Sequence, residues 1–325
     1  MINLSIGIIG AGYVSNMHSK AIRNVYPDIV QYVFDVNRER AKQFATDNKC
    51  VFMESLDEMM SCVDSLIIAS STDSHYKLSM EAMKLKKNLL CEKPMALSLD
   101  NAINMVEICK TYRLNCSIGY NYRFFDIVGI INNELDIGNW LKIKVTIERL
   151  IRNDWFGKGT GVLADLGTHL IDLIAYLCKS DISITSCSSN IKYEHGVDVY
   201  AELNGKTKND VFFTMISARI LDEDNVGLSL EIEGETGEFY YDSRDINHYK
   251  LKRYDRNECY IADVGTSVSD FFDFSMSICR QDKEWIDSIL YETECCNASF
   301  LDGLKVQEVL KYIGYEEGAK FGEKI

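Results

Sequence analysis

The first residues of this sequence that could do chemistry are the glycines of Gly10-Ala11-Gly12. An apolar, β-branched run over residues 4–9 predicts a buried strand before them, and a helical pattern follows from Val14 to Ile22. A strand, a Gly-x-Gly turn and a helix together present backbone N–H groups to a pyrophosphate. Gly10 would allow the tight turn and Gly12 the close approach of phosphates, and we expect the backbones of Tyr13 and Val14 beside them. The alternative is an ordinary surface turn.

An acid downstream favours the dinucleotide interpretation. The predicted strand Val30–Phe34 ends at Asp35, about 20 residues after the glycines, where dinucleotide-binding folds hold the ribose hydroxyls. A carboxylate there accepts hydrogen bonds from a ribose diol and repels a 2′-phosphate, so NAD is the expected cofactor. Arg38 could pair with a phosphate, which leaves NADP open.

Composition excludes several classes of protein. The chain has 325 residues, a hydrophobic fraction of 46% and a formal net charge of −14, with 11 cysteines and 2 prolines. This charge argues against binding nucleic acid or an anionic membrane surface. The sequence has no apolar run long enough for a membrane span, no recognisable secretion signal and no CxxC pair. We therefore expect a cytoplasmic protein with reduced thiols.

The elements that must position these residues fall into two patterns. Residues 1–119 alternate strands and helices, which predicts an α/β dinucleotide-binding (Rossmann) domain with a doubly wound parallel sheet. Residues 120–325 predict an α+β domain with an open, mainly antiparallel sheet for substrate binding and oligomerisation. Hairpin turns are expected at Asn204-Gly205 and at residues 235–237, an irregular stretch at 255–275, and closing helices at 280–291 and 300–319. The last helix could pack back on the first domain.

Polar residues follow three of the predicted parallel strands. Because ligands bind at the carboxyl ends of such strands, these residues should gather at one edge with the glycines. We expect cofactor contacts from Ser70, Ser71, His75, Glu92, Lys93 and Asn121.

Four motifs occur in a familiar order: Gly10-Ala11-Gly12, Glu92-Lys93-Pro94, the segment 119–124 (GYNYRF) and the segment 165–169 (DLGTH). With them the chain resembles the glucose–fructose oxidoreductase/inositol dehydrogenase/MocA (Gfo/Idh/MocA) family of nicotinamide-dependent sugar oxidoreductases over nearly its whole length. The resemblance implies a small carbohydrate-type substrate and a homodimer or homotetramer. Two positions depart from the family pattern: Ser15 replaces the third glycine, and the segment 70–75 lacks the usual proline.

By this resemblance Lys93, Asp165 and His169 form the catalytic group. An imidazole titrates near neutrality and can accept a hydroxyl proton, and Asp165 lies four residues earlier, on the same face of a helix. An ammonium at Lys93 can stabilise negative charge on the reacting oxygen. The alternatives are half of a metal site, for which the sequence offers no third ligand, a hydrogen-bonded core histidine and a surface lysine.

Substrate contacts are expected from Tyr122, Arg123 and Trp155 together with the catalytic group. Arg123 could instead brace a domain interface, and Trp155 could pack in the core. The side chains of Tyr13 and His18 are expected to pack.

The expected function is hydride transfer between a nicotinamide and a secondary alcohol or ketone of a sugar, cyclitol or nucleotide-linked sugar. The alternatives are an NAD-dependent glycoside hydrolase and a non-catalytic dinucleotide-binding sensor of the same fold.

Overall fold

The computed structural model describes residues 4–151, 161–245, 248–254, 258–263, 270–293 and 297–315. Internal packing divides the chain into two units, Met1–Phe124 with Ser275–Gln307 and Phe125–Phe274 with Glu308–Ile325. The predicted boundary between the domains lies at residue 119, whereas this division also assigns residues 120–124 and 275–307 to the first unit.

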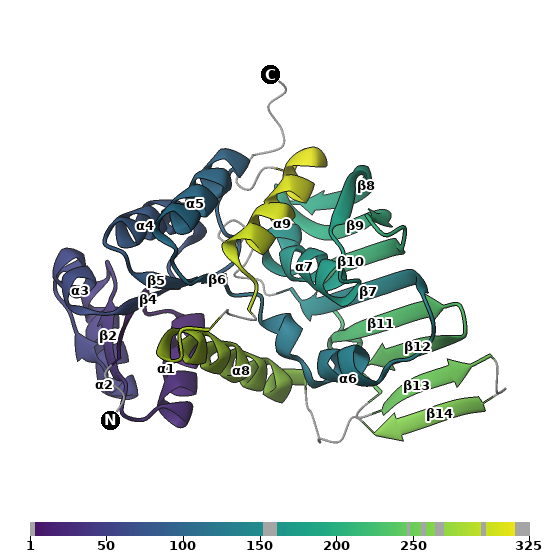
Figure 1. Cartoon of the computed structure of the whole chain (residues 1–325), viewed down its shortest axis with the longest axis horizontal. Coiled ribbons are helices and arrows are strands. Elements are labelled where there is room, and N and C mark those ends of the chain that lie inside the picture. The colour runs from purple at the N-terminus through teal and green to yellow at the C-terminus, as the bar shows by residue number, and fades with distance from the viewer. Residues whose placement is uncertain are drawn as a thin grey trace. The chain divides into compact units, whose positions relative to one another are not determined.

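A parallel sheet of six strands forms the centre of the first unit (Figure 1). Its strand order, β3-β2-β1-β4-β5-β6, reverses between β1 and β4, as in a doubly wound dinucleotide-binding fold. The predicted fold of this region is confirmed. The strands are β1 (Ser5–Ile9), β2 (Val30–Phe34), β3 (Val51–Phe52), β4 (Ser65–Ile68), β5 (Asn88–Cys91) and β6 (Cys116–Ile118), and the helices are α1 (Tyr13–Val25), α2 (Arg38–Asn48), α3 (Leu56–Cys62), α4 (Thr72–Lys84) and α5 (Leu99–Tyr112).

Local sequence explains these elements. Ile6, Ile8 and Ile67 are fully buried, as expected for strands covered on both faces. The side chain of Ser98 accepts a hydrogen bond from Asn101 N at 3.3 Å and so caps α5. Helix α8 (Asp270–Leu290) lies beside α1 and places Trp285 in the core formed around β1 and β2 (Figure 1).

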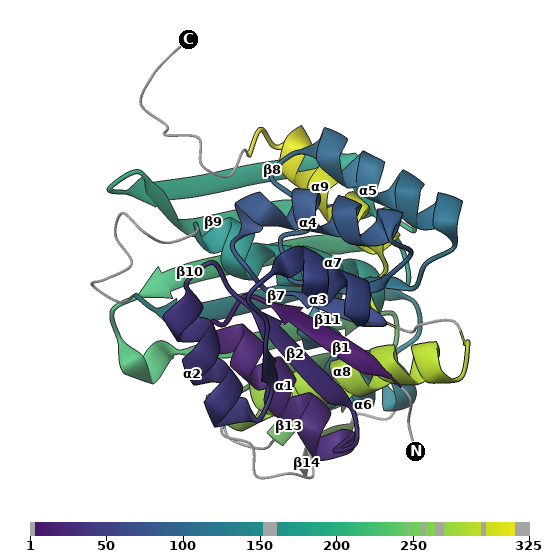
Figure 2. The same ribbon diagram turned by 90° about the vertical axis from the view of Figure 1, so that its left-hand side faces the viewer.

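The second unit is built on a sheet of eight strands in the order β14-β13-β12-β11-β7-β10-β9-β8 (Figure 1), and Figure 2 shows the part of this order from β8 through β9, β10 and β7 to β11. All neighbouring pairs are antiparallel except β7 and β10, so the predicted, mainly antiparallel sheet is confirmed. The strands are β7 (Trp140–Leu150), β8 (Ile182–Glu194), β9 (Val197–Thr207), β10 (Phe212–Ile220), β11 (Gly227–Gly234), β12 (Gly237–Asp242), β13 (His248–Arg253) and β14 (Glu258–Asp263), and the helices are α6 (Asp126–Glu134), α7 (Thr168–Leu177) and α9 (Phe300–Tyr312), the last divided between the units.

Two sequence predictions in this region are wrong. Asn204-Gly205 is not a turn, because β9 continues to Thr207 and Gly205 leaves room for the ring of Phe213. Part of the expected irregular stretch 255–275 forms β14 and the start of α8. The helix expected around His169 is present, and it begins as a π-helix over Leu163–Gly167 before α7.

No helix of the described part of the chain is long and apolar enough to cross a membrane.

Candidate functional site

The turn between β1 and α1 contains two glycines with different roles. The backbone conformation requires glycine at Gly10, whereas Gly12 leaves open space beside the backbone. Gly10 has a φ of 103°, and a Cβ there would lie 2.5 Å from the carbonyl oxygen of Ala69. Gly12 is extended, and a Cβ at this position would meet nothing within 4 Å. The N-cap residue Gly12 has no side chain that could accept from the first N–H groups of α1. The arrangement suits a pyrophosphate.

The residues that follow show why serine is accepted in the third position. Ser15 is fully buried, with its Oγ 3.5 Å from the carbonyl oxygen of Ala69, so a small side chain fits between helix and strand. Val14 is half-buried. The Tyr13 side chain is 60% exposed, so the expectation that it packs is wrong.

Asp35 is held as an anion beside the glycine turn. Its Oδ2 accepts from Ala11 N at 2.8 Å and its Oδ1 from Asn37 N at 2.7 Å, while Arg40 Nη2 donates to Oδ1 at 2.8 Å. Burial would raise the pKa of this carboxyl, but Arg40 and the two N–H donors hold it below the usual value. Arg38 pairs instead with Glu54 on the surface. Sequence reasoning missed Arg40 as the partner of Asp35.

The ends of β4 and β5 are linked through one histidine. His75 is buried, with Nδ1 2.9 Å from the carbonyl oxygen of Pro94 and Nε2 3.1 Å from that of Ser70. The Ser70 hydroxyl lies 2.6 Å from that of Ser74, and Ser71 precedes α4 without a side-chain cap. This second open helix N-terminus lies at the same edge of the sheet as α1.

Lys93 follows a buried carboxylate and is half-buried. Glu92 Oε1 accepts from His18 Nε2 at 3.1 Å, and His18 Nδ1 lies 2.9 Å from both carboxylate oxygens of Asp282. The Lys93–Pro94 peptide bond is cis. We expected the side chain of His18 to pack, and this prediction did not include its charged partners, because Asp282 is 264 residues away along the chain.

The residues after β6 contact the C-terminal helices of the same unit. Asn121 is buried and donates through Nδ2 to Ser277 Oγ at 2.7 Å. Tyr122 is buried as well, and Arg123 Nη2 lies 3.6 Å from Asp302 Oδ2. Trp155, the remaining predicted substrate residue, lies outside the described residues.

Asp165 and His169 lie in the second unit, where the π-helix meets α7. A π-turn inside a helix is often found at functional sites. The carboxylate of Asp165 pairs with the guanidinium of Arg219, at the end of β10. His169 is 4% exposed. Arg219 has no local sequence signal, because it lies 54 residues after its partner.

Another acid that the sequence did not suggest supports this helical segment. Asp198 Oδ2 accepts from Leu163 N at 2.7 Å, and Oδ1 accepts from the Tyr315 hydroxyl at 3.0 Å. Burial raises the pKa of Asp198 despite these donors. A Cβ at Gly161 would overlap the Asp198 carboxylate, which explains the glycine before the π-helix.

No group of three His, Cys, Asp or Glu side chains that could hold a metal ion occurs among the described residues.

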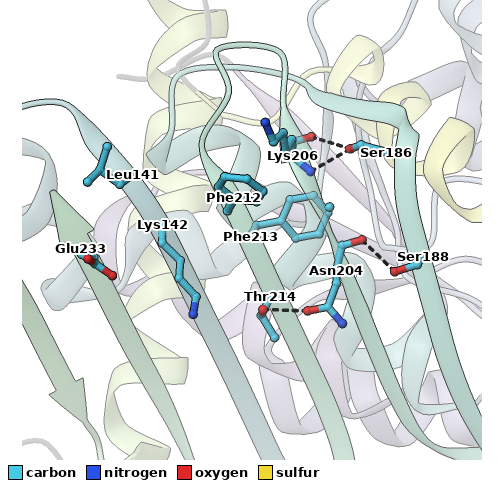
Figure 3. Close-up of a pocket in the computed structure, with 11 residues that line it drawn as sticks. Leu141, Lys142, Ser186, Ser188, Asn204, Lys206, Phe212, Phe213, Thr214 and Glu233 are labelled. Carbon is cyan, nitrogen blue, oxygen red and sulfur yellow. Dashed lines mark hydrogen bonds between the residues drawn. The ribbon is translucent and has the colours of Figure 1, made fainter.

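A separate hollow of about 630 Å³ lies on the eight-stranded sheet (Figure 3). Its polar side chains are tied together across the strands: Thr214 Oγ1 donates to Asn204 Oδ1 at 2.8 Å, and Lys206 N donates to Ser186 Oγ at 2.8 Å (Figure 3). Phe212 forms part of its wall. None of the predicted site residues that the structure describes lines this hollow.

Known proteins resemble both parts of the chain. Residues 4–120 match the family model described as "Oxidoreductase family, NAD-binding Rossmann fold", and residues 133–240 match that of the Gfo/Idh/MocA C-terminal domain. Glucose-6-phosphate 3-dehydrogenase of Bacillus subtilis (strain 168) is 32% identical over 94% of this chain and 94% of its own.

Solved structures share the fold at lower identity. UDP-N-acetylglucosamine 3-dehydrogenase from Acidithiobacillus ferrooxidans has a TM-score of 0.81 at 16% identity, covering 96% of this chain and 97% of its own. A levoglucosan dehydrogenase in complex with NADH and levoglucosan has a TM-score of 0.83 at 18% identity, covering 96% of each chain. The chain belongs to the Gfo/Idh/MocA family of oxidoreductases, with an NAD-binding Rossmann fold in its first unit.

Proposed function

We propose that this protein is a dehydrogenase or reductase that transfers hydride between NAD and a secondary alcohol or ketone of a sugar, cyclitol or nucleotide-linked sugar. The observation that carries the proposal is the near full-length similarity to a glucose-6-phosphate 3-dehydrogenase, in a chain that has Lys93, Asp165 and His169. A sugar phosphate is accordingly the first substrate to try.

The proposed binding of NAD rests on residues of the first unit. The open space at Gly12 and the uncapped N-termini of α1 and α4 fit a pyrophosphate. The Asp35 carboxylate, already fixed by Ala11 N and Asn37 N, would accept from ribose hydroxyls and would repel a 2′-phosphate. Bound NAD supplies the hydride acceptor in the oxidative direction.

The remaining chemistry falls to side chains. When an alcohol carbon loses hydride with its electron pair, the hydroxyl proton passes to a ring nitrogen of His169, which acts as the base. The ammonium of Lys93 donates a hydrogen bond to the same oxygen and stabilises its developing negative charge. Asp165, anchored by Arg219, binds a substrate hydroxyl or orients the imidazole. In the reverse direction the protonated His169 is the acid.

Absorbance at the nicotinamide band tests this proposal. NAD or NADP is mixed with glucose 6-phosphate, other sugar phosphates, inositols, polyols and nucleotide sugars, and the wild type is compared with Lys93→Ala. Lys86→Ala, which changes an exposed lysine just after α4, is the matched control. We expect one substrate to be turned over with NAD by the wild type and the control, and at least about a hundredfold more slowly by Lys93→Ala.

Two other results would replace the proposal. NAD that copurifies and shows no net reduction while a glycoside is cleaved would indicate the hydrolase. Tight NAD binding with neither activity would indicate the sensor.

We also infer a homodimer or homotetramer formed through the eight-stranded sheet. Phe212 and Leu141, which are 55% and 45% exposed, both line the hollow on this sheet, and exposed apolar side chains that adjoin in this way are typical of interaction surfaces. Light scattering coupled to gel filtration should give two or four times the chain mass of 37.1 kDa, and Phe212→Glu should reduce it.

A further inference from the structure

The segment that carries Lys93 is tied to a buried histidine on each side. Before Lys93, Glu92 Oε1 accepts from Nε2 of His18, on α1, at 3.1 Å. After it, the carbonyl oxygen of Pro94 accepts from Nδ1 of His75, on α4, at 2.9 Å. Both histidines are fully or almost fully buried. Two different helices therefore fix the backbone on either side of one lysine.

The geometry at His75 sets its charge. Each ring nitrogen faces a carbonyl oxygen, Pro94 at 2.9 Å and Ser70 at 3.1 Å, and a carbonyl can only accept. Both nitrogens must therefore carry a proton, which makes the ring an imidazolium. Burial by itself would lower the pKa of His75, but Cys91 and the two carbonyls raise it to about 9. The Glu92 carboxylate also acts electrostatically on this ring.

His18 is enclosed between two carboxylates. Its Nδ1 lies 2.9 Å from both oxygens of Asp282, on α8, and its Nε2 lies 3.1 Å from Glu92. Every nitrogen-to-carboxylate contact needs a proton, so the three groups share two protons and carry a net charge of about −1. Burial would lower the pKa of His18, but Asp282 and Glu92 raise it to about 10. Removing one member would leave a buried charge uncompensated.

The Glu92 carboxylate is held by further contacts. The backbone N–H of Lys93 donates to Glu92 Oε2 at 3.3 Å. A Cβ at Gly119 would overlap Glu92 Oε1, so the carboxylate packs directly on the backbone after β6. His18, the Lys93 amide and this backbone together fix both carboxylate oxygens of Glu92. They therefore also fix the orientation of the chain where the loop begins.

We propose that His18 and His75 are positioning residues for Lys93, and that they hold the Glu92-Lys93-Pro94 segment from both sides through Glu92 and through the Pro94 carbonyl. The inference rests on the proposed role of Lys93 in catalysis. It also gives α1 and α4 two functions each. Their uncapped N-termini suit NAD, and their histidines hold the Lys93 segment. Breaking either connection should loosen Lys93 while the phosphate-binding turn at Gly10 and Gly12 stays in place.

The test compares Asp282→Asn, which removes one charge beside His18, with His75→Gln, whose single amide nitrogen replaces the two ring nitrogens that face the carbonyls. Asp287→Asn is the matched control, since Asp287 lies on the same helix and contacts Lys283 and Tyr26 instead of His18. Three quantities are measured on the full chain: amide hydrogen exchange of a peptide spanning residues 91–97, the Kd for NAD, and kcat and KM with the sugar that the wild type oxidises.

We expect both variants to speed exchange in this peptide at least about tenfold and to lower kcat at least about tenfold. For Asp282→Asn the Kd for NAD and KM should stay within about threefold of the wild type, and the control should match the wild type throughout. A histidine that only stabilises the fold would not separate kcat from KM and Kd in this way.

The inference is overturned if both variants fold, exchange this peptide as slowly as Asp287→Asn and keep the wild-type kcat. If Asp282→Asn does not fold, His75→Gln alone decides by the same criteria. Should Lys93→Ala keep full turnover, the proposed function fails, and the exchange measurement still decides whether the two histidines hold the loop.

Discussion

Substituting Gly12 should separate cofactor binding from folding. Gly12 has φ −88° and ψ −170°, an extended conformation open to any residue, and a Cβ there would meet no atom within 4 Å. Gly12→Ala therefore adds no strain, but the gain of about 0.4–1 kcal/mol from the reduced freedom of the unfolded chain is offset by the poor fit of Ala to the N-cap of α1. The free energy of unfolding should therefore stay within about 1 kcal/mol of the wild type, and in a chain of this size the Tm should change by no more than about 3 °C.

The same methyl group occupies the space where the pyrophosphate is expected. If it displaces about two charge-assisted hydrogen bonds from the α1 N-terminus, each contributing about 1.5–3 kcal/mol, at least about 3 kcal/mol of binding free energy is lost. The Kd for NAD should then rise at least about a hundredfold. Calorimetric titration of NAD measures the Kd, and differential scanning calorimetry measures the Tm.

Gly10→Ala provides the contrast. Its φ of 103° and the backbone oxygen of Ala69 at 2.5 Å leave no room for a Cβ, so this variant should lose about 1–3 kcal/mol of stability or more. A folded Gly12→Ala protein that binds NAD as tightly as the wild type would refute the assignment of this turn to the pyrophosphate.

Three other predictions follow from the charged residues. Asp35→Asn should raise the Kd for NAD about 10–100-fold and reduce the preference for NAD over NADP, as measured by titration with each cofactor. Arg219→Met should remove the guanidinium that pairs with Asp165 and lower both the Tm and kcat, whereas Arg219→Lys should restore part of each. The raised pKa of His75, about 9 against 6.5, adds up to about 3 kcal/mol of stability that is complete below pH about 6.5 and disappears as the pH rises through 9. His18, with a pKa of about 10, adds to this alkaline loss, and urea unfolding at several pH values should show a shallower decline in His75→Gln.

Local sequence predicted the first sheet well, because each strand there is a short apolar run between turn and cap residues. The predicted bounds of Val30–Phe34 agree with the structure, and the strand predicted over residues 4–9 is β1, Ser5–Ile9. Parallel strands buried on both faces have a strong signal of this kind. The expectation that polar residues gather at the carboxyl ends of these strands followed from the doubly wound topology.

The second sheet shows where such reasoning fails. Strands β13 and β14 lie at one end of the sheet, and in β13 Tyr249 and Leu251 alternate with Lys250 and Lys252, a strand signal that sequence reasoning overlooked. Asn204-Gly205 has the composition of a turn, but the facing Phe213 and the bond from Thr214 keep it in a strand. At Asn204-Gly205 tertiary pairing overrides local preference.

The sequence predicted the motifs of the candidate site, but it did not predict which side chains contact them. Asp35 and Glu92 were identified, yet the side chains that fix them, Arg40 and His18, were assigned no such role. Asp282 is 264 residues from His18, and Arg219 is 54 residues from Asp165. Contacts at such separations have no periodicity that a single sequence could reveal.

The most direct test of the central claim follows the hydride itself. The substrate found in the absorbance screen is prepared with deuterium on its carbinol carbons and incubated with NAD, and the reduced nicotinamide is analysed by mass spectrometry. We predict one deuterium in the NADH formed by the wild type, at a rate that Lys93→Ala lowers at least about a hundredfold. NADH without deuterium, or an undiminished rate in Lys93→Ala, would contradict the account.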